Sequence, residues 1–400
     1  MTRFFLPLAI SLCLSTACSE GAEQTPLADP SDAGVAQSEG DAAAPEHNDA
    51  SHEADLQGSE AAPEDGLSAT DPEDASPSER VEDTLATSPE DVSAPIESAD
   101  PDESGEWAFS VSTHTETLSS GDQSSEVLMV IYMPEGEGPF PLVIFTHGFQ
   151  LAPADYVSYG EKLASWGYIA LLPQLPGALF DGPNHVELKG YLSALIDWVD
   201  ADAPQSEGVL LGKADPSSLG LAGHSMGGKI SLLLATEDER PLAVFGVDPV
   251  DAAGGPFDTD PTEFPSVTPE LMDQIDVPLA LIGETTNGEG AGGFAPACAP
   301  AEDNFHQYYV HATSPAIEVE ILGASHMSFL DDPDCGLACF ACPAGTDDPA
   351  QTRALSQGYM VAFFNLFIRN EEGYRTFLVG DKMNEDIEQG LVLSETKNSF

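Results

Sequence analysis

The sequence predicts an α/β fold, with a mostly parallel central sheet and helices on both faces. Three observations support this prediction. From Trp107 onward, short apolar and β-branched runs alternate with longer amphipathic stretches, the order expected of strands joined by crossover helices. The runs in the middle of this region are apolar throughout, as in strands that are buried on both faces. A serine flanked by glycines lies between one such run and the amphipathic stretch that follows it.

The expected elements follow one another in a regular order. Residues 126–133 alternate between apolar and polar, which is typical of a strand near a sheet edge. Further strands are expected at 142–145, 168–172, 219–222, 243–247, 279–282 and 317–321. Helices are expected at 156–166, 188–199, 227–236 and, as the last element, 353–368. These elements belong to about 290 residues, a length that one large core can accommodate.

The first 106 residues differ in composition from the rest. Residues 19–106 hold 26 acidic residues, one basic residue (Arg80) and almost no large apolar residue. Such a segment cannot bury enough apolar surface to offset its ordering entropy. We therefore expect residues 18–106 to be a disordered acidic linker and residues 107–400 to be a single folded domain.

The extreme N-terminus indicates export. In residues 1–17, Arg3 precedes an apolar run that is too short to span a bilayer, as in a signal peptide. The stretch LSTAC that ends at Cys18 resembles a bacterial lipoprotein cleavage box, with Ser15 where leucine is usual. We expect Cys18 to be lipidated and the protein to be extracytoplasmic, anchored to the envelope; the alternative is plain secretion.

The charge of the chain restricts its partners. The sequence has 69 acidic and 12 basic residues, for a formal net charge of −57. Such a surface repels nucleic acid and anionic lipid headgroups. We therefore expect no nucleic-acid partner, no membrane contact except through the lipid anchor, and a monomeric protein.

Four cysteines of the folded part fall in an oxidising compartment if the protein is exported. They are Cys298, Cys335, Cys339 and Cys342. An even number of cysteines in that setting predicts two disulfides, with three pairings open. The last three have C-x3-C-x2-C spacing, which leaves zinc as the alternative, but this spacing is irregular for zinc and we expect no metal.

The strongest motif is G-x-S-x-G at Gly223-His224-Ser225-Met226-Gly227. An expected strand precedes it and an expected helix follows, which is the context of the nucleophile turn in α/β-hydrolases. The glycines leave room for the close backbone approach that this turn requires. The N-terminus of the following helix places positive potential where an oxyanion forms. The motif predicts Ser225 as the nucleophile of an α/β-hydrolase fold.

A second segment, His147-Gly148-Phe149, follows the expected strand 142–145. A His-Gly pair at this place is the usual start of the oxyanion-hole loop in this fold. We expect the backbone N–H groups of Phe149 and Met226 to donate to the oxyanion. His147 itself is expected to be structural.

The base should be a histidine late in the chain, because the order in this fold is serine, acid, histidine. Three histidines follow Ser225. His326 lies in the loop that leaves strand 317–321, whereas His306 and His311 lie in a helical stretch, so we predict His326.

Two carboxylates compete for the role of the acid. Asp248 ends strand 243–247 and Glu284 ends strand 279–282. Either carboxylate could orient the imidazole of His326 and stabilise its protonated form. Their positions in the sequence alone do not decide between them.

Several separate segments resemble the chlorophyllase-like branch of the α/β-hydrolases. They are SWGYI at 165–169 with PQL at 173–175, GHSMGGK at 223–229, GVDPVD at 246–251, CAP at 298–300, NFH at 304–306 and GASHMSFLDD at 323–332. Trp166 stands where the family has histidine, and Met226 where it has arginine. Bacterial polyester hydrolases and platelet-activating-factor acetylhydrolases are similar around Ser225.

The resemblance implies a Ser-Asp-His triad in which Asp248 is the acid. It also implies an ester with a bulky apolar part, whether a small molecule, a lipid or a polymer, cleaved without a cofactor. We expect Trp166 and His224 to contact that substrate. The alternatives are a lipase, polyesterase, thioesterase or peptidase, or a surface lipoprotein that keeps the fold as a binding module.

Overall fold

The computed structural model describes residues 98–177, 184–252, 260–289, 297–333 and 342–400, all within one compact unit, residues 88–400. The expected signal peptide, the expected lipidation site Cys18 and most of the expected acidic linker lie outside the described residues, as do Cys335 and Cys339. None of the described helices is both long enough and apolar enough to cross a membrane.

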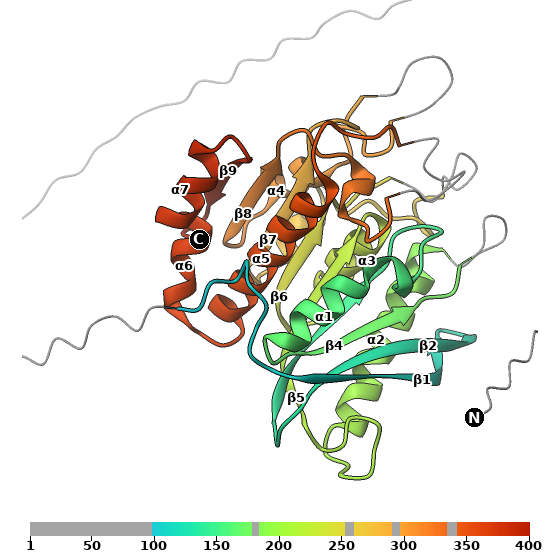
Figure 1. Ribbon diagram of the computed structural model, residues 1–400. Helices are drawn as coiled ribbons and strands as arrows, with labels where there is room; N and C mark the ends of the chain where they lie inside the picture. Colours follow the sequence, from blue (N-terminus) through green and yellow to red (C-terminus); the bar gives the residue numbers. More distant parts are fainter. Residues whose placement is uncertain (1–97, 178–183, 253–259, 290–296, 334–341) are drawn as a thin grey trace, which may run out of the picture. The chain divides into compact units, whose positions relative to one another are not determined.

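The described residues form a nine-stranded sheet in the order β1-β2-β4-β3-β5-β6-β7-β8-β9 (Figure 1). The strands are β1 (Phe109–Ser120), β2 (Gln123–Pro134), β3 (Phe140–Thr146), β4 (Ile169–Gln174), β5 (Ala214–His224), β6 (Pro241–Val247), β7 (Leu279–Glu284), β8 (Ala316–Ile321) and β9 (Val392–Lys397). The six strands from β4 to β8 in this order are parallel, whereas β1, β2 and β9 pair antiparallel at the two edges. The predicted mostly parallel α/β sheet is confirmed.

Helices cover both faces of this sheet (Figure 1). They are α1 (Val157–Ser165), α2 (His185–Asp202), α3 (Met226–Ala235), α4 (Phe305–His311), α5 (Pro349–Phe367), α6 (Arg375–Val379) and α7 (Asp381–Glu388). Buried side chains of α1 and α5 share one hydrophobic cluster, and those of α2, α3 and α4 share another. The sheet therefore separates two cores.

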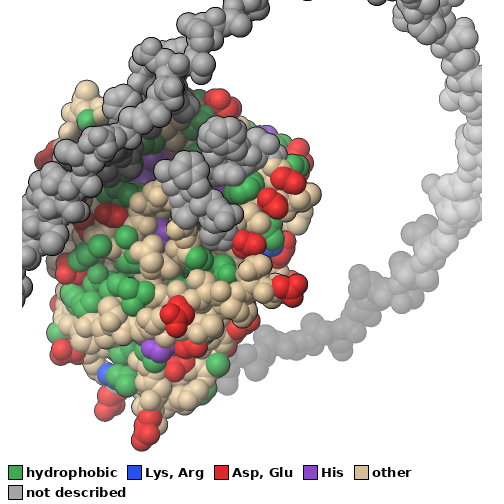
Figure 2. Space-filling model, turned by 90° about the vertical axis from the view of Figure 1, so that its right-hand side faces the viewer, with side chains coloured by type: hydrophobic (Ala, Val, Ile, Leu, Met, Phe, Trp, Pro, Cys, Tyr) green, Lys and Arg blue, Asp and Glu red, His purple; other side chains and the backbone are tan. Residues whose placement is uncertain are grey.

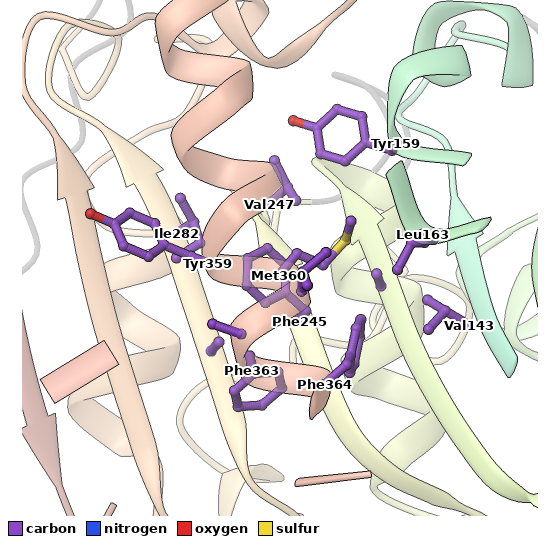
Figure 3. Close-up of a cluster of buried hydrophobic side chains, with 14 of the residues drawn as sticks. Val143, Tyr159, Leu163, Phe245, Val247, Ile282, Tyr359, Met360, Phe363 and Phe364 are labelled. Atoms are coloured by element: carbon purple, nitrogen blue, oxygen red, sulfur yellow. The ribbon is translucent and has the colours of Figure 1, made fainter. Parts of the chain in front are cut away.

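Alternation along the strands determines which core each side chain enters. In β6, Phe245 and Val247 belong to the cluster of α1 and α5, whereas Val244 faces the other cluster. A period of two is the geometry of a pleated strand. Figure 3 shows Met360 and Phe364 of α5 packed over Phe245. This packing fixes the strands whose carboxyl ends carry the site.

All the expected strands and helices are present, but other elements were not expected. β1 was missed because it is a largely exposed, polar edge strand that pairs with β2 along its whole length. The prediction that helix 353–368 closes the chain was wrong, because α6, α7 and β9 follow it. β9 completes the sheet beside β8.

The described part begins before Trp107, the expected start of the domain. Lys162 Nζ donates to the backbone oxygens of Asp102 and Glu103, at 3.0 and 2.7 Å, and the backbone N–H of Gly105 donates to Ser165 Oγ. Residues 98–106 therefore pack against the end of α1 rather than belonging wholly to the linker.

A buried ion pair joins α3 to the loop that follows β6. Lys229 Nζ lies 3.2 Å from Asp251 Oδ1, and both side chains are fully buried. The same carboxylate accepts hydrogen bonds from the backbone N–H groups of Val267 and Thr268. The pair therefore holds the loop after Asp248 against the helix that begins after Ser225.

This pair should contribute strongly to stability. We expect Lys229→Met to lower the free energy of unfolding by about 3–5 kcal/mol, because it leaves the buried Asp251 carboxylate without its counter-ion. The matched control is Lys382→Met, which removes an exposed pair with Glu385 and should cost less than about 1 kcal/mol. Urea denaturation measures both, and equal stabilities of the two variants would contradict this account.

Candidate active site

Ser225 lies on a strained turn between β5 and α3. Its φ of 55° and ψ of −124° place a non-glycine residue in a region that L-residues rarely adopt. A Cβ on Gly223 would come within 2.5 Å of the backbone of Gly227, and one on Gly227 within 2.1 Å of the Thr146 oxygen. Only glycine fits at either position, which explains why the motif requires both.

Ser225, His326 and Asp248 are hydrogen-bonded in a row. The Oγ of Ser225 lies 2.9 Å from His326 Nε2, and His326 Nδ1 lies 2.6 Å from Asp248 Oδ2. The Asp248 side chain is fully buried and that of His326 nearly so. Because a carboxylate only accepts, Nδ1 carries the proton, and the bare Nε2 can accept the proton of the serine hydroxyl. The arrangement can remove a proton from Ser225.

The fold brings these residues together at one edge of the sheet. Ser225 follows β5, Asp248 follows β6, and His326 begins the short 3-10 helix His326–Phe329 after β8. The carboxyl ends of parallel strands meet at this edge, where open α/β sheets bind ligands. The backbone N–H of Asp248 donates to the Ile282 oxygen at 2.6 Å, which sets the position of the carboxylate.

Glu284, the other candidate acid, makes no hydrogen bond to His326. Its side chain is buried, and Oε2 accepts from the backbone N–H groups of Thr286 and Asn287. Burial, and secondarily the negative charge of Asp248, raises the pKa of Glu284 to about 8. Asn287 Oδ1 in turn accepts from the backbone N–H of His326 at 2.8 Å. Glu284 therefore shapes the loop that supports His326.

The segment expected to form the oxyanion hole lies against Ser225. A Cβ on Gly148 would come within 3.3 Å of Ser225 Cβ. Phe149 is 41% exposed, and Met226 begins α3, where the helix N-terminus supplies positive potential. The buried ring of His147 bonds the Gly148 oxygen at 2.8 Å and Gln174, so it has the expected structural position.

The expectation that His224 contacts the substrate was wrong. Its side chain is fully buried. Nδ1 lies 2.8 Å from the Tyr156 hydroxyl, and Nε2 lies 2.9 Å from the backbone oxygen of His326. Both ring nitrogens are therefore engaged inside the protein. Burial, together with the nearby His326, holds the pKa of His224 well below its usual value.

The same expectation for Trp166 was also wrong. Trp166 follows α1 and precedes β4, so it lies toward the amino end of a parallel strand, opposite the edge that carries Ser225. Its indole N–H donates to the Glu103 oxygen at 3.2 Å, and its ring packs edge-on against Tyr374. The side chain fills the core behind residues 98–106.

One disulfide, Cys298–Cys342, lies beside the loop that supports His326. The next residue after Cys342, Pro343, accepts a hydrogen bond from Asn287 Nδ2 at 3.0 Å. The second expected disulfide falls on Cys335 and Cys339, outside the described residues. Within the described ranges, no group of three or more His, Cys, Asp or Glu residues is arranged to hold a metal ion.

The other candidate histidines lie away from the serine. His306 and His311 both lie on α4, as the sequence predicts. His306 Nδ1 is 2.9 Å from the Glu318 carboxylate, a pair in which the histidine is half exposed.

Known proteins to which this chain is similar belong to one family. The family model described as Chlorophyllase matches residues 103–385. Chlorophyllase-1 of Arabidopsis thaliana is 29% identical over 266 residues, which cover 63% of this chain and 79% of that protein. Chlorophyllase-2 of the same plant is 23% identical over 270 residues, covering 65% and 83%. The chloroplastic Chlorophyllase-1 of Citrus sinensis is 26% identical over 275 residues, covering 66% and 79%.

The raised pKa of Glu284 predicts a pH-dependent stability. The folded protein holds this proton to about pH 8, whereas the unfolded chain releases it near pH ~4.3. The folded state therefore binds more protons between these values, and its stability falls as the pH rises through them.

Glutamine at this position has no proton to lose. We expect Glu284→Gln to gain several degrees in unfolding midpoint relative to wild type between about pH 5 and pH 8. Glu137→Gln, which alters an exposed carboxylate, is the control and should not gain. Thermal unfolding of variant and wild type at both pH values measures this gain. If the midpoint of Glu284→Gln differed from that of wild type by the same amount at pH 5 and pH 8, the raised pKa of Glu284 would be contradicted.

Proposed function

The chain belongs to the chlorophyllase family of α/β-hydrolases, and on that premise we propose that it cleaves carboxylic esters with Ser225 as the nucleophile. The observation that carries the proposal is the row of hydrogen bonds from Ser225 through His326 to the buried Asp248, at 2.9 and 2.6 Å. A serine hydroxyl is a weak nucleophile unless a positioned base removes its proton. The contact between Ser225 Oγ and His326 Nε2 supports His326 in that role.

The proposed reaction is a two-step acyl transfer. Ser225 Oγ attacks the ester carbonyl while His326 Nε2 takes its proton, and Asp248 stabilises the resulting imidazolium. The backbone N–H groups of Phe149 and Met226 donate to the tetrahedral oxyanion. His326 then protonates the leaving alkoxide, and water hydrolyses the acyl-enzyme by the same sequence of proton transfers.

The proposed substrate is an ester with a bulky apolar part. The similarity to proteins named chlorophyllase supports this class, as does the 41% exposure of Phe149 beside the serine.

On the face drawn in Figure 2, acidic side chains are scattered and basic ones are few. The strongly negative net charge disfavours a polyanionic substrate or nucleic acid. We propose that the protein acts as a monomer and without a cofactor.

The test of this function is hydrolysis of p-nitrophenyl esters, from acetate to palmitate, by the full chain. We expect turnover in wild type and a loss of at least ~10³-fold in Ser225→Ala, because the nucleophile is removed. Ser231→Ala is the control, since the hydroxyl of this buried serine of α3 donates, within the described ranges, only to backbone oxygens. Absence of turnover in folded wild type, or equal rates in both variants, would contradict the proposal.

The proposal includes export and lipid anchoring at Cys18. Its support is the basic and apolar N-terminal segment and the LSTAC box. We expect the mature chain in the membrane fraction of a bacterial host to begin at Cys18 and to carry lipid, as intact-mass spectrometry can measure. Cys18→Ser should release the protein from that fraction. An unmodified, freely soluble wild-type chain would contradict the anchor.

A further inference from the structure

Two fully buried side chains connect the backbone beside Phe149 to the backbone of His326. Tyr156 ends the 3-10 helix Pro153–Tyr156, before α1, and His224 ends β5. The Tyr156 hydroxyl lies 3.2 Å from the Gly148 nitrogen and 2.8 Å from His224 Nδ1. His224 Nε2 lies 2.9 Å from the His326 oxygen. The four residues form one continuous hydrogen-bonded chain.

The chemistry of the end groups fixes the direction of every bond in this chain. The His326 oxygen can only accept, so His224 Nε2 carries a proton and donates. Burial holds the pKa of His224 well below its usual value, so the ring is neutral and Nδ1 is a bare acceptor. The Tyr156 hydroxyl therefore donates to Nδ1, and its oxygen accepts from the Gly148 N–H. All the donors and acceptors are matched.

A second hydrogen bond, from His147, holds the peptide group between Gly148 and Phe149. The Gly148 oxygen accepts a hydrogen bond from His147 Nδ1 at 2.8 Å. In a trans peptide the N–H of the following residue points opposite to this carbonyl. The direction of the Phe149 N–H is therefore set by His147, and the height of the loop above Ser225 is set by Tyr156.

We propose that Tyr156 and His224 are positioning residues that couple the oxyanion-hole loop to His326, so that the oxyanion donor and the base keep one fixed spacing around Ser225. This inference rests on the proposed esterase function. Neither side chain is hydrogen-bonded to Ser225 Oγ or to the ring of His326, and both bond to the backbone, at Gly148 and at His326. The ring of His224 also packs against the ring of His326, with centroids 4.5 Å apart. A buried pair that only satisfied its own polar groups would stabilise the fold without affecting the transition state selectively.

The test compares two tyrosines that lie three residues apart. Tyr156→Phe removes the hydroxyl that bridges Gly148 and His224. Tyr159→Phe is the matched control, since this equally buried tyrosine donates, among the described residues, only to Ser356 Oγ, at 3.4 Å. The measurements are kcat, KM and the affinity for an alkylboronic acid, which forms a tetrahedral adduct on a serine nucleophile.

For Tyr156→Phe we expect kcat to fall roughly 10- to 100-fold with KM within about twofold, because a donor aimed at the oxyanion is displaced. Boronate affinity should fall by a similar factor, since the adduct resembles the transition state. Tyr159→Phe should change neither quantity by more than about twofold. A folded Tyr156→Phe enzyme that matches the control in both quantities would overturn the inference.

A second measurement does not depend on turnover. In the ¹⁵N spectrum of histidine-labelled protein, we expect His224, assigned with His224→Asn, to remain neutral and protonated at Nε2 from about pH 5 to pH 8. The Nδ1 resonance should shift in Tyr156→Phe and stay unchanged in Tyr159→Phe. Protonation at Nδ1, or a charged ring, would overturn the proposed row of hydrogen bonds from Gly148 to His326, even if the enzyme were active. Failure of all ester turnover with the expected spectrum would instead count against the proposed function.

Discussion

The backbone turn at Ser225 is the constraint on which the rest of the site depends. Its positive φ is tolerated because Gly223 and Gly227 let β5, α3 and the end of β3 approach more closely than any Cβ allows. Strain of this kind persists only where surrounding structure over-determines it. Here the surroundings are two hydrophobic cores, one on each side of the sheet, and the buried pair of Lys229 and Asp251.

Around that turn, burial and hydrogen bonding give the ionisable groups different charge states. Asp248 is buried and bonded to His326, where a negative charge stabilises an imidazolium. Glu284 lies beside it, and the low-dielectric surroundings raise its pKa to about 8, so that two neighbouring carboxylates do not both carry charge at neutral pH. His224 is neutral for the same reason and can accept at one nitrogen while it donates at the other. These neighbouring groups thus differ in charge because their surroundings differ.

The sequence predicted the sheet, most helices, Ser225 and His326, because periodicity, the G-x-S-x-G context and the place of His326 after the last parallel strand carry those signals. Strand position alone could not choose between Asp248 and Glu284, since both end strands; the family resemblance favoured Asp248, which lies 2.6 Å from His326 Nδ1 in the structure. His224 and Trp166 were assigned to the substrate from the motif neighbourhood, although both side chains point into the protein. Tyr156 belongs to no motif, and β1 and β9 are edge strands with weak apolar patterns.

The proposed reaction requires a covalent acyl-enzyme at Ser225. The most direct measurement is peptide mass spectrometry after acid quench of the full chain mixed briefly with p-nitrophenyl acetate. We expect one acetyl group on the peptide that holds Ser225, absent from Ser225→Ala and lost with time in wild type as water completes the reaction. An unmodified Ser225 during active turnover, or a stable acetyl group on another residue, would contradict it.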